Sequence, residues 1–117
     1  EIEPGLNVNG QLTLGENIAD LGGIQAAYKA YMAWSDEQGE EAEIAGLTPQ
    51  QQFFVAYAQG WCSLRSDEVA RQLAATDSHS PPDFRVNGPL QNTPSFAEAF
   101  ACEAGDAMVR EDICEVW

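Results

Sequence analysis

The sequence predicts a mainly α-helical fold with one structured, proline-rich loop and little strand. The strongest helix signal is Thr48-Pro49-Gln50-Gln51, which combines an N-cap threonine, proline at the first helical position and glutamine at the third. Apolar residues also recur at helical spacing in several segments. The 117 residues are enough for one domain with a modest core.

The first helix is expected after a lead-in loop over residues 1–10, which is rich in Pro, Gly and Asn. Thr13-Leu14-Gly15-Glu16 fits a capping box, with Thr13 as the N-cap and Glu16 reaching back to it. This pattern predicts a helix that starts near Thr13 and runs through Asp20.

The pair Gly22-Gly23 permits a bend, after which apolar spacing predicts that the helix continues to about Trp34. Residues 35–46 are acidic and contain two glycines, which indicates a surface loop. The helix that starts at Thr48 is expected to run to Cys62, and its low polarity predicts burial of its aromatic side chains.

The second half of the chain alternates short helices with prolines. Residues 67–75 are expected to form a short helix, and 76–82 (TDSHSPP) an irregular loop. Residues 84–86 are predicted to be extended and closed by an Asn-Gly-Pro turn at 87–89. A last helix is expected from Thr93-Pro94 to about Ala104.

The charge balance excludes several classes of partner. Nineteen acidic residues stand against five basic ones, for a net charge of −14. Nucleic acids and anionic membrane surfaces both require a cationic footprint, so neither is expected as a partner. The longest apolar run, residues 53–58, is far shorter than the roughly 18 residues of a membrane span. Because the chain begins at Glu1 without methionine or signal peptide, we expect further chain upstream.

The three cysteines, Cys62, Cys102 and Cys114, are an odd number and form no C-x-x-C pair. Because no such pair is present, we do not expect them to form a zinc site with the single histidine of the chain. Three reduced thiols, one internal bridge with one thiol left over, and bridges to chain outside this sequence all remain open.

The segment GENIAD places Glu16 and Asp20 four residues apart, on one face of a helix, where two like charges repel each other. The structural interpretation is a capping glutamate and a solvated aspartate. The functional interpretation is that Glu16 ligates a metal while Asp20 fixes a neighbouring ligand. A catalytic zinc needs about three protein ligands, and GENIAD offers one.

The only histidine, His79, lies two residues after Asp77 and six before Arg85, in a loop stiffened by two prolines. Such a loop can present a hydrogen-bond donor rigidly. Asp77 could orient the imidazole and favour its charged form. The structural alternative is a surface histidine in a polar loop.

Five segments occur in order over essentially the whole chain: GENIADLGG, AYAQGWC, DSHSPPDFRVNGPLQN, FAEAFAC and the terminal CEVW. Together they resemble the C-terminal segment of the catalytic domain in the neprilysin and endothelin-converting-enzyme family of zinc metallopeptidases. The resemblance implies the helical C-terminal portion of a zincin-type catalytic lobe, which acts on peptide substrates in a zinc-dependent endopeptidase.

The resemblance also implies a role for each candidate residue. Glu16 is similar to the third zinc ligand, and Asp20 to the aspartate that orients a zinc-bound histidine. His79 resembles the histidine that stabilises the oxyanion, and Asp77 resembles its orienting partner. Arg85 resembles the arginine that holds the bound peptide by a backbone carbonyl.

One departure limits what residues 1–117 can do alone. The H-E-x-x-H helix of the family, which carries two zinc histidines and the general base, has no counterpart in this sequence. We therefore expect Zn²⁺ in the intact enzyme, and an inactive chain without tightly bound zinc in isolation. The alternatives are a catalytically silent acidic helical fragment or interaction module, and one half of a nicked peptidase.

The resemblance further implies that the three cysteines form disulfides with chain outside this sequence. Residues similar to Cys62 and Cys102 bridge to the N-terminal part of the ectodomain. The one similar to Cys114 bridges to a cysteine shortly upstream. Such bridges imply an extracytoplasmic location, whether secreted, periplasmic or in the ectodomain of an anchored protein.

Overall fold

The mainly α-helical fold predicted from the sequence is confirmed. The computed structural model describes residues 1–39 and 42–116, and within them it has α1 (Gly10–Gln38), α2 (Pro49–Gly60), α3 (Asp67–Thr76), α4 (Pro82–Gln91) and α5 (Pro94–Ala99). β-Structure in these residues is confined to two isolated bridges, Glu3 with Leu6 and Ile44 with Leu47. None of the described helices is long and apolar enough to cross a membrane.

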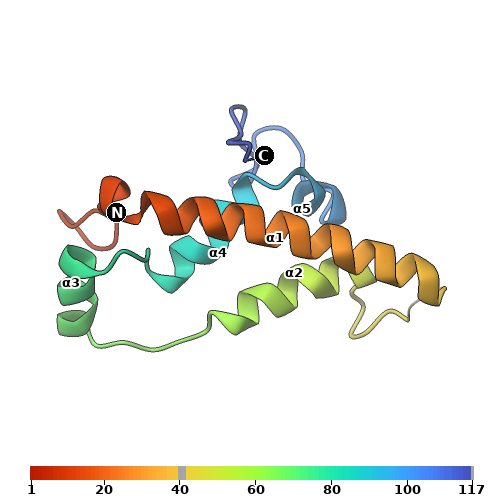
Figure 1. Ribbon diagram of the computed structural model, residues 1–117, viewed down its shortest axis with the longest axis horizontal. Helices are drawn as coiled ribbons and strands as arrows, with labels where there is room; N and C mark the ends of the chain where they lie inside the picture. Colours follow the sequence, from red (N-terminus) through yellow and green to blue (C-terminus); the bar gives the residue numbers. More distant parts are fainter. Residues whose placement is uncertain (40–41, 117) are drawn as a thin grey trace.

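The long helix α1 runs along the molecule, which measures 47 × 30 × 26 Å (Figure 1). In this view α2 lies below α1, while α5 and the C-terminal segment lie above it. Helix α4 packs against both α1 and α5. Helix α3 lies at the end of the molecule that holds the N-terminus, and it buries no residue (Figure 1).

The core forms where α1, α2 and α4 meet, at Ile24, Phe54 and Leu90. Phe54 is 1% exposed, and its ring stacks on Tyr28 at 4.9 Å between centroids. Burial of such side chains contributes about 1.5–3 kcal/mol each, so this cluster is what holds α1 against the helices below and beside it. It thereby positions the faces of α1 and α4 that carry GENIAD and Arg85.

The capping box predicted at Thr13 is wrong. The N-cap of α1 lies four residues earlier, at Asn9, which is extended (φ −79°, ψ 91°) and whose side-chain oxygen accepts a hydrogen bond from the N–H of Leu12 at 3.1 Å. Thr13 lies inside the helix, where its hydroxyl donates to the carbonyl of Asn9 at 3.1 Å. Glu16 is therefore free of any capping role.

The bend predicted at Gly22-Gly23 is also wrong, since α1 is continuous through both glycines to Gln38. Each glycine in a helix costs about 1 kcal/mol relative to alanine. Burial of Leu21 and Ile24 on either side outweighs this cost. The surface loop predicted from residue 35 begins after Gln38, and residues 40–41 of it lie outside the described residues.

The extended segment predicted at residues 84–86 is helical instead. Pro82 occupies the start of α4, where proline is well tolerated, and Pro89 lies inside the helix near its end. Val86 packs against the core one turn before the buried Leu90, and this contact favours the helix over the expected turn. The last helix, α5, ends at Ala99 and not near residue 104.

Three predicted helix starts are confirmed, at Thr48, Ser66 and Thr93, the last of which is the N-cap of α5. Thr48 and Gln51 form a reciprocal capping box at α2, with Thr48 Oγ1 accepting from Gln51 N–H at 3.3 Å and Gln51 Oε1 accepting from Thr48 N–H at 3.0 Å. Ser66 caps α3, which matches the helix expected there to within a residue. Trp117, the last residue of the CEVW segment, lies outside the described residues.

Candidate functional site

The five predicted site residues meet in one place, although they come from three separate segments. Helix α1 presents Glu16 and Asp20 one turn apart, residues 77–81 form the loop that carries His79, and α4 carries Arg85. Glu16 Oε2 lies 3.4 Å from His79 Nε2, and Asp20 pairs with Arg85. Each acid of GENIAD therefore has its own cationic or proton-bearing neighbour, which offsets their mutual repulsion.

Asp77 fixes His79 by two hydrogen bonds. Its Oδ1 lies 2.8 Å from Nδ1 of the imidazole and accepts the backbone N–H of His79 at 2.9 Å. These bonds, first the backbone one and then the side-chain one, lower the pKa of Asp77 below its usual range. With Nδ1 turned to this carboxylate, Nε2 is left facing Glu16, and the imidazole is 43% exposed.

A chain of buried polar contacts ties the loop to α1. The hydroxyl of Ser80, 6% exposed, donates to Asn17 Oδ1 at 2.7 Å, and Asn17 Nδ2 donates to Thr13 Oγ1 at 3.1 Å. The two buried side chains in this set of contacts, Thr13 and Ser80, both have hydrogen-bond partners. The loop is therefore held beside α1 at little desolvation cost. Sequence analysis missed this tie, since 63 residues separate Asn17 from Ser80 and no local pattern joins them.

Arg85 is held more tightly than its predicted role suggests. Its Nε and Nη2 each donate to a carboxylate oxygen of Asp20 at 2.6 Å, and the two side chains are only 16% and 12% exposed. The hydrogen bonds to Asp20 raise the pKa of Arg85 above its usual value. Its Cζ lies 4.0 Å from the ring centroid of Trp61, a contact that the sequence did not reveal. The hydrogen bonds of this side chain to other described residues use Nε and Nη2 and not Nη1.

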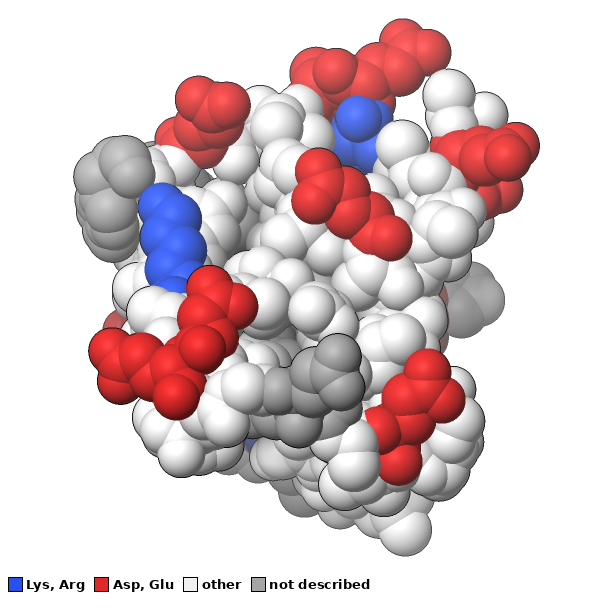
Figure 2. Space-filling view, turned by 90° about the vertical axis from the view of Figure 1, so that its right-hand side faces the viewer, with Lys and Arg blue, Asp and Glu red and all other residues white. Residues whose placement is uncertain are grey.

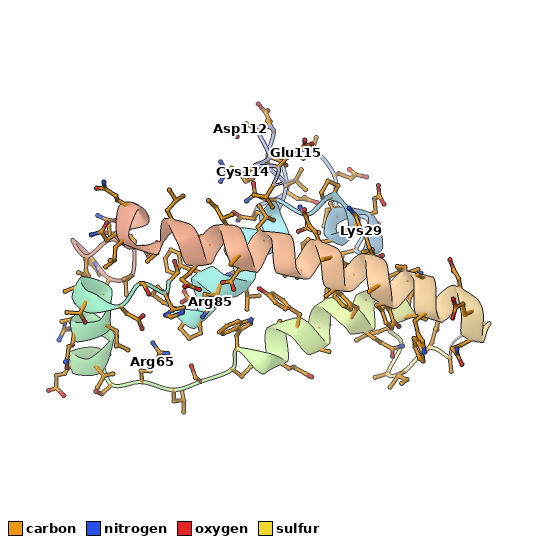
Figure 3. The ribbon with its side chains drawn as sticks, viewed as in Figure 1. Lys29, Arg65, Arg85, Asp112, Cys114 and Glu115 are labelled. Carbon is orange, nitrogen blue, oxygen red and sulfur yellow. The ribbon has the colours of Figure 1, made fainter. Side chains whose placement is uncertain are left out.

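A cavity of about 520 Å³ opens beside His79. Its walls are mostly apolar, with Trp61 and Val86 among them, and Arg65 supplies a charged group. Figure 3 shows Arg65 and Arg85 on the same side of α1. A concave, largely apolar space next to a few polar side chains is typical of a site that binds an organic ligand.

The donor set does not by itself fit a zinc ion. Across residues 1–39 and 42–116, no three His, Cys, Asp or Glu side chains come close enough together to hold a metal. Glu16 has the chemistry of one carboxylate ligand, whereas a catalytic zinc takes about three protein ligands. Any zinc at this site needs further ligands from outside these residues.

The three cysteines are free thiols in the structure, with Cys62 and Cys114 exposed and Cys102 half-buried. Cys114 lies on the opposite side of α1 from Arg85 (Figure 3). Its backbone N–H donates to Asn92 Oδ1 at 2.7 Å, which holds the C-terminal segment near the end of α4. None of the three thiols is paired with another in the described residues.

Acidic side chains spread over the face shown in Figure 2, with few Lys or Arg among them. The whole chain has a net charge of −14, so its exposed surface carries a negative potential. A negative potential of this kind attracts cations and repels polyanions.

Comparison with known proteins decides the family. The sequence profile of peptidase family M13 matches residues 1–116. This chain belongs to peptidase family M13. Among M13 relatives, the human membrane metallo-endopeptidase-like 1 is 50% identical over 113 residues, and mouse endothelin-converting enzyme 1 is 49% identical over 112 residues. These matches cover 95% and 94% of this chain but only 14% and 15% of the relatives.

Two solved structures share the same helical arrangement. The zinc metalloprotease Zmp1 of Mycobacterium tuberculosis in its open state superposes with a TM-score of 0.90 at 37% identity, covering 98% of this chain and 18% of that one. A chain of the Haemonchus galactose-containing glycoprotein complex gives 0.80 at 40% identity, covering 89% and 19%. The chain therefore has the fold of one segment of these larger proteins.

Proposed function

We propose that the full-length protein is a zinc-dependent endopeptidase and that residues 1–117 are the C-terminal part of its catalytic domain. The observation that carries this proposal is the meeting of Glu16, His79 and Arg85 within a chain that family M13 matches almost end to end. Metal-assisted peptide hydrolysis requires a carboxylate ligand, a fixed imidazole and an arginine with free donors, and these three groups are present here. It also requires the remaining metal ligands and a base.

In this proposal Glu16 is one zinc ligand, and zinc when bound supplies Lewis acidity toward the peptide carbonyl. His79 donates from Nε2 to the oxygen that becomes negative as the peptide bond is attacked. Asp77 keeps the ring aligned for this and compensates the charge of the protonated imidazole. Because these donors are fixed before substrate arrives, little reorganisation is needed during the reaction.

Arg85 is proposed to hold the substrate by a backbone carbonyl, using the donors that Asp20 leaves free. Asp20 is proposed to orient a zinc-bound histidine from outside these residues. Its carboxylate already holds Arg85, so it links substrate positioning to the metal site. Carboxylate oxygens have several lone pairs, and both roles are compatible with one side chain.

For the isolated chain we propose no tight zinc binding and no catalysis. Bridges from Cys62, Cys102 and Cys114 to chain outside this sequence, and an extracytoplasmic location, belong to the same proposal. It is supported by three thiols that are exposed or half-buried and by the membrane metallo-endopeptidase-like relative.

The test is zinc content together with hydrolysis of a quenched fluorescent peptide by the full-length protein, with and without a chelator. We expect about one zinc per protein and chelator-sensitive hydrolysis. Glu16→Gln should lose most of the zinc and of the activity, whereas Glu37→Gln, the same change at an exposed position of α1, should keep both. Full zinc and activity in Glu16→Gln would exclude Glu16 as a ligand.

A further inference from the structure

We propose that Trp61 is a positioning residue that acts through Arg85, by a cation–π contact that holds the guanidinium plane in the orientation needed to bind substrate. This inference rests on the proposed function of Arg85. Cζ of Arg85 lies 4.0 Å from the centroid of the Trp61 ring, well inside the roughly 6 Å range of such contacts.

The guanidinium is held from two directions. Asp20 takes Nε and Nη2 along one edge, and Cζ lies over the ring of Trp61. Hydrogen bonds along one edge still allow the guanidinium to tilt about that edge. Contact with the indole ring restricts this tilt. Because the Arg85 side chain is only 16% exposed, the attraction between cation and ring is weakly screened by water.

Helix α2 also holds the backbone of Arg85. Pro89 has no N–H, so the carbonyl of Arg85 lacks its usual partner four residues on in α4. The hydroxyl of Tyr57 donates to that carbonyl at 2.6 Å. Burial raises the pKa of Tyr57, and its phenol therefore stays a donor over the ordinary pH range.

Tyr57 and Trp61 are one helical turn apart at the C-terminal end of α2, and their rings meet edge to face at 6.4 Å between centroids. Helix α2 thus contacts both the main chain and the side chain of Arg85. Trp61 also lines the 520 Å³ cavity. The residue that contacts the guanidinium is therefore also part of the wall of this cavity.

A purely structural role for Trp61, or direct contact with substrate, predicts different kinetics. Positioning through Arg85 changes KM, depends on the electron density of the ring and disappears when Arg85 is absent. A wall residue that touches substrate changes KM whether or not Arg85 is present. Replacement of a residue with a purely structural role lowers stability and does not change KM in particular.

The experiment uses the full-length enzyme with tryptophan 61 replaced by analogues bearing one to four fluorines, which weaken the ring quadrupole with little change of shape. KM should rise step by step with fluorination while kcat stays nearly constant. Trp61→Leu should raise KM about 3- to 30-fold, and Trp61→Phe should recover much of that loss. Trp34→Leu, the same change at an exposed tryptophan of α1, should leave both constants unchanged.

The series is then repeated in the Arg85→Gln background. We expect Arg85→Gln to raise KM by itself and the fluorination trend to vanish. A flat KM series in the parent enzyme, or an equal trend in both backgrounds, would overturn the inference while leaving the peptidase assignment intact. Absence of chelator-sensitive hydrolysis in the parent enzyme would instead contradict the proposed function.

Discussion

Arg85 and Asp20 form a two-point ion pair across 65 residues of sequence, with Nε and Nη2 each 2.6 Å from an oxygen of the carboxylate. The planar fork of the guanidinium matches the carboxylate in geometry, and an ammonium group could not reproduce it. This pair joins α4 to the GENIAD face of α1. Arg85, the proposed substrate-binding residue, is therefore attached to the helix face that carries Glu16, the proposed zinc ligand.

Removal of Asp20 should therefore destabilise the protein strongly. Asp20→Asn leaves the largely buried Arg85 without its counter-charge, and we expect a loss of about 2–4 kcal/mol in the free energy of unfolding. Urea unfolding of the full-length protein measures this loss. Asp36→Asn, an identical change at an exposed site on α1, should cost less than about 0.5 kcal/mol. A double variant with Arg85→Gln should cost less than the sum of its parts, and strict additivity would rule out the pairing.

His79→Gln should lower kcat far more than it changes KM. The imidazole is proposed to act only on charge that develops in the transition state, so we expect a fall of about 10²–10³-fold in kcat. Steady-state kinetics on one peptide substrate measures both constants. Ser78→Ala, at an exposed neighbouring position of the loop, should behave like the parent enzyme. Unchanged turnover in His79→Gln would remove His79 from the mechanism.

The contribution of Asp77 to stability should depend on pH. Its pKa is lowered in the folded protein by the two bonds to His79, so the ionised carboxylate favours folding above its unfolded pKa of about 4. We expect the difference in unfolding midpoint between the parent and Asp77→Asn to shrink as the pH falls below about 4, because protonation of Asp77 removes its advantage over asparagine.

Thermal melts at closely spaced pH values follow this difference, with Asp36→Asn as the matched control. A difference that grows on acidification would mean that the folded protein holds Asp77 in its protonated form.

The capping box of α2 should be worth about 1 kcal/mol. Thr48→Ala removes the acceptor for Gln51 N–H and leaves that donor to water, at a cost of about 0.5–2 kcal/mol in the free energy of unfolding. Thr48→Ser keeps the hydroxyl and should stay near the parent. Chemical denaturation compares the three proteins, and equal stability of the alanine and serine variants would mean that the cap is dispensable.

The sequence was sufficient for features that depend on neighbouring residues. The α2 start follows from Thr48, Pro49 and Gln51 because these groups satisfy one another within a single turn. The closeness of Asp77 to His79 follows from their separation of two residues in a turn-forming loop. The mainly α-helical fold and membership of family M13 were likewise predicted and are confirmed.

Only the tertiary structure decided which predicted breaks are helical and which side chains meet. Gly22-Gly23 and the segment at 84–86 are helical because Ile24 and Leu90 bury themselves against Phe54, and this burial outweighs local preference. The pairing of Asp20 with Arg85 and the cation–π contact of Trp61 with Arg85 join residues far apart in the chain. Such contacts depend on how α1, α2 and α4 pack, because local sequence patterns specify a helix and its apolar face but leave its partner undefined.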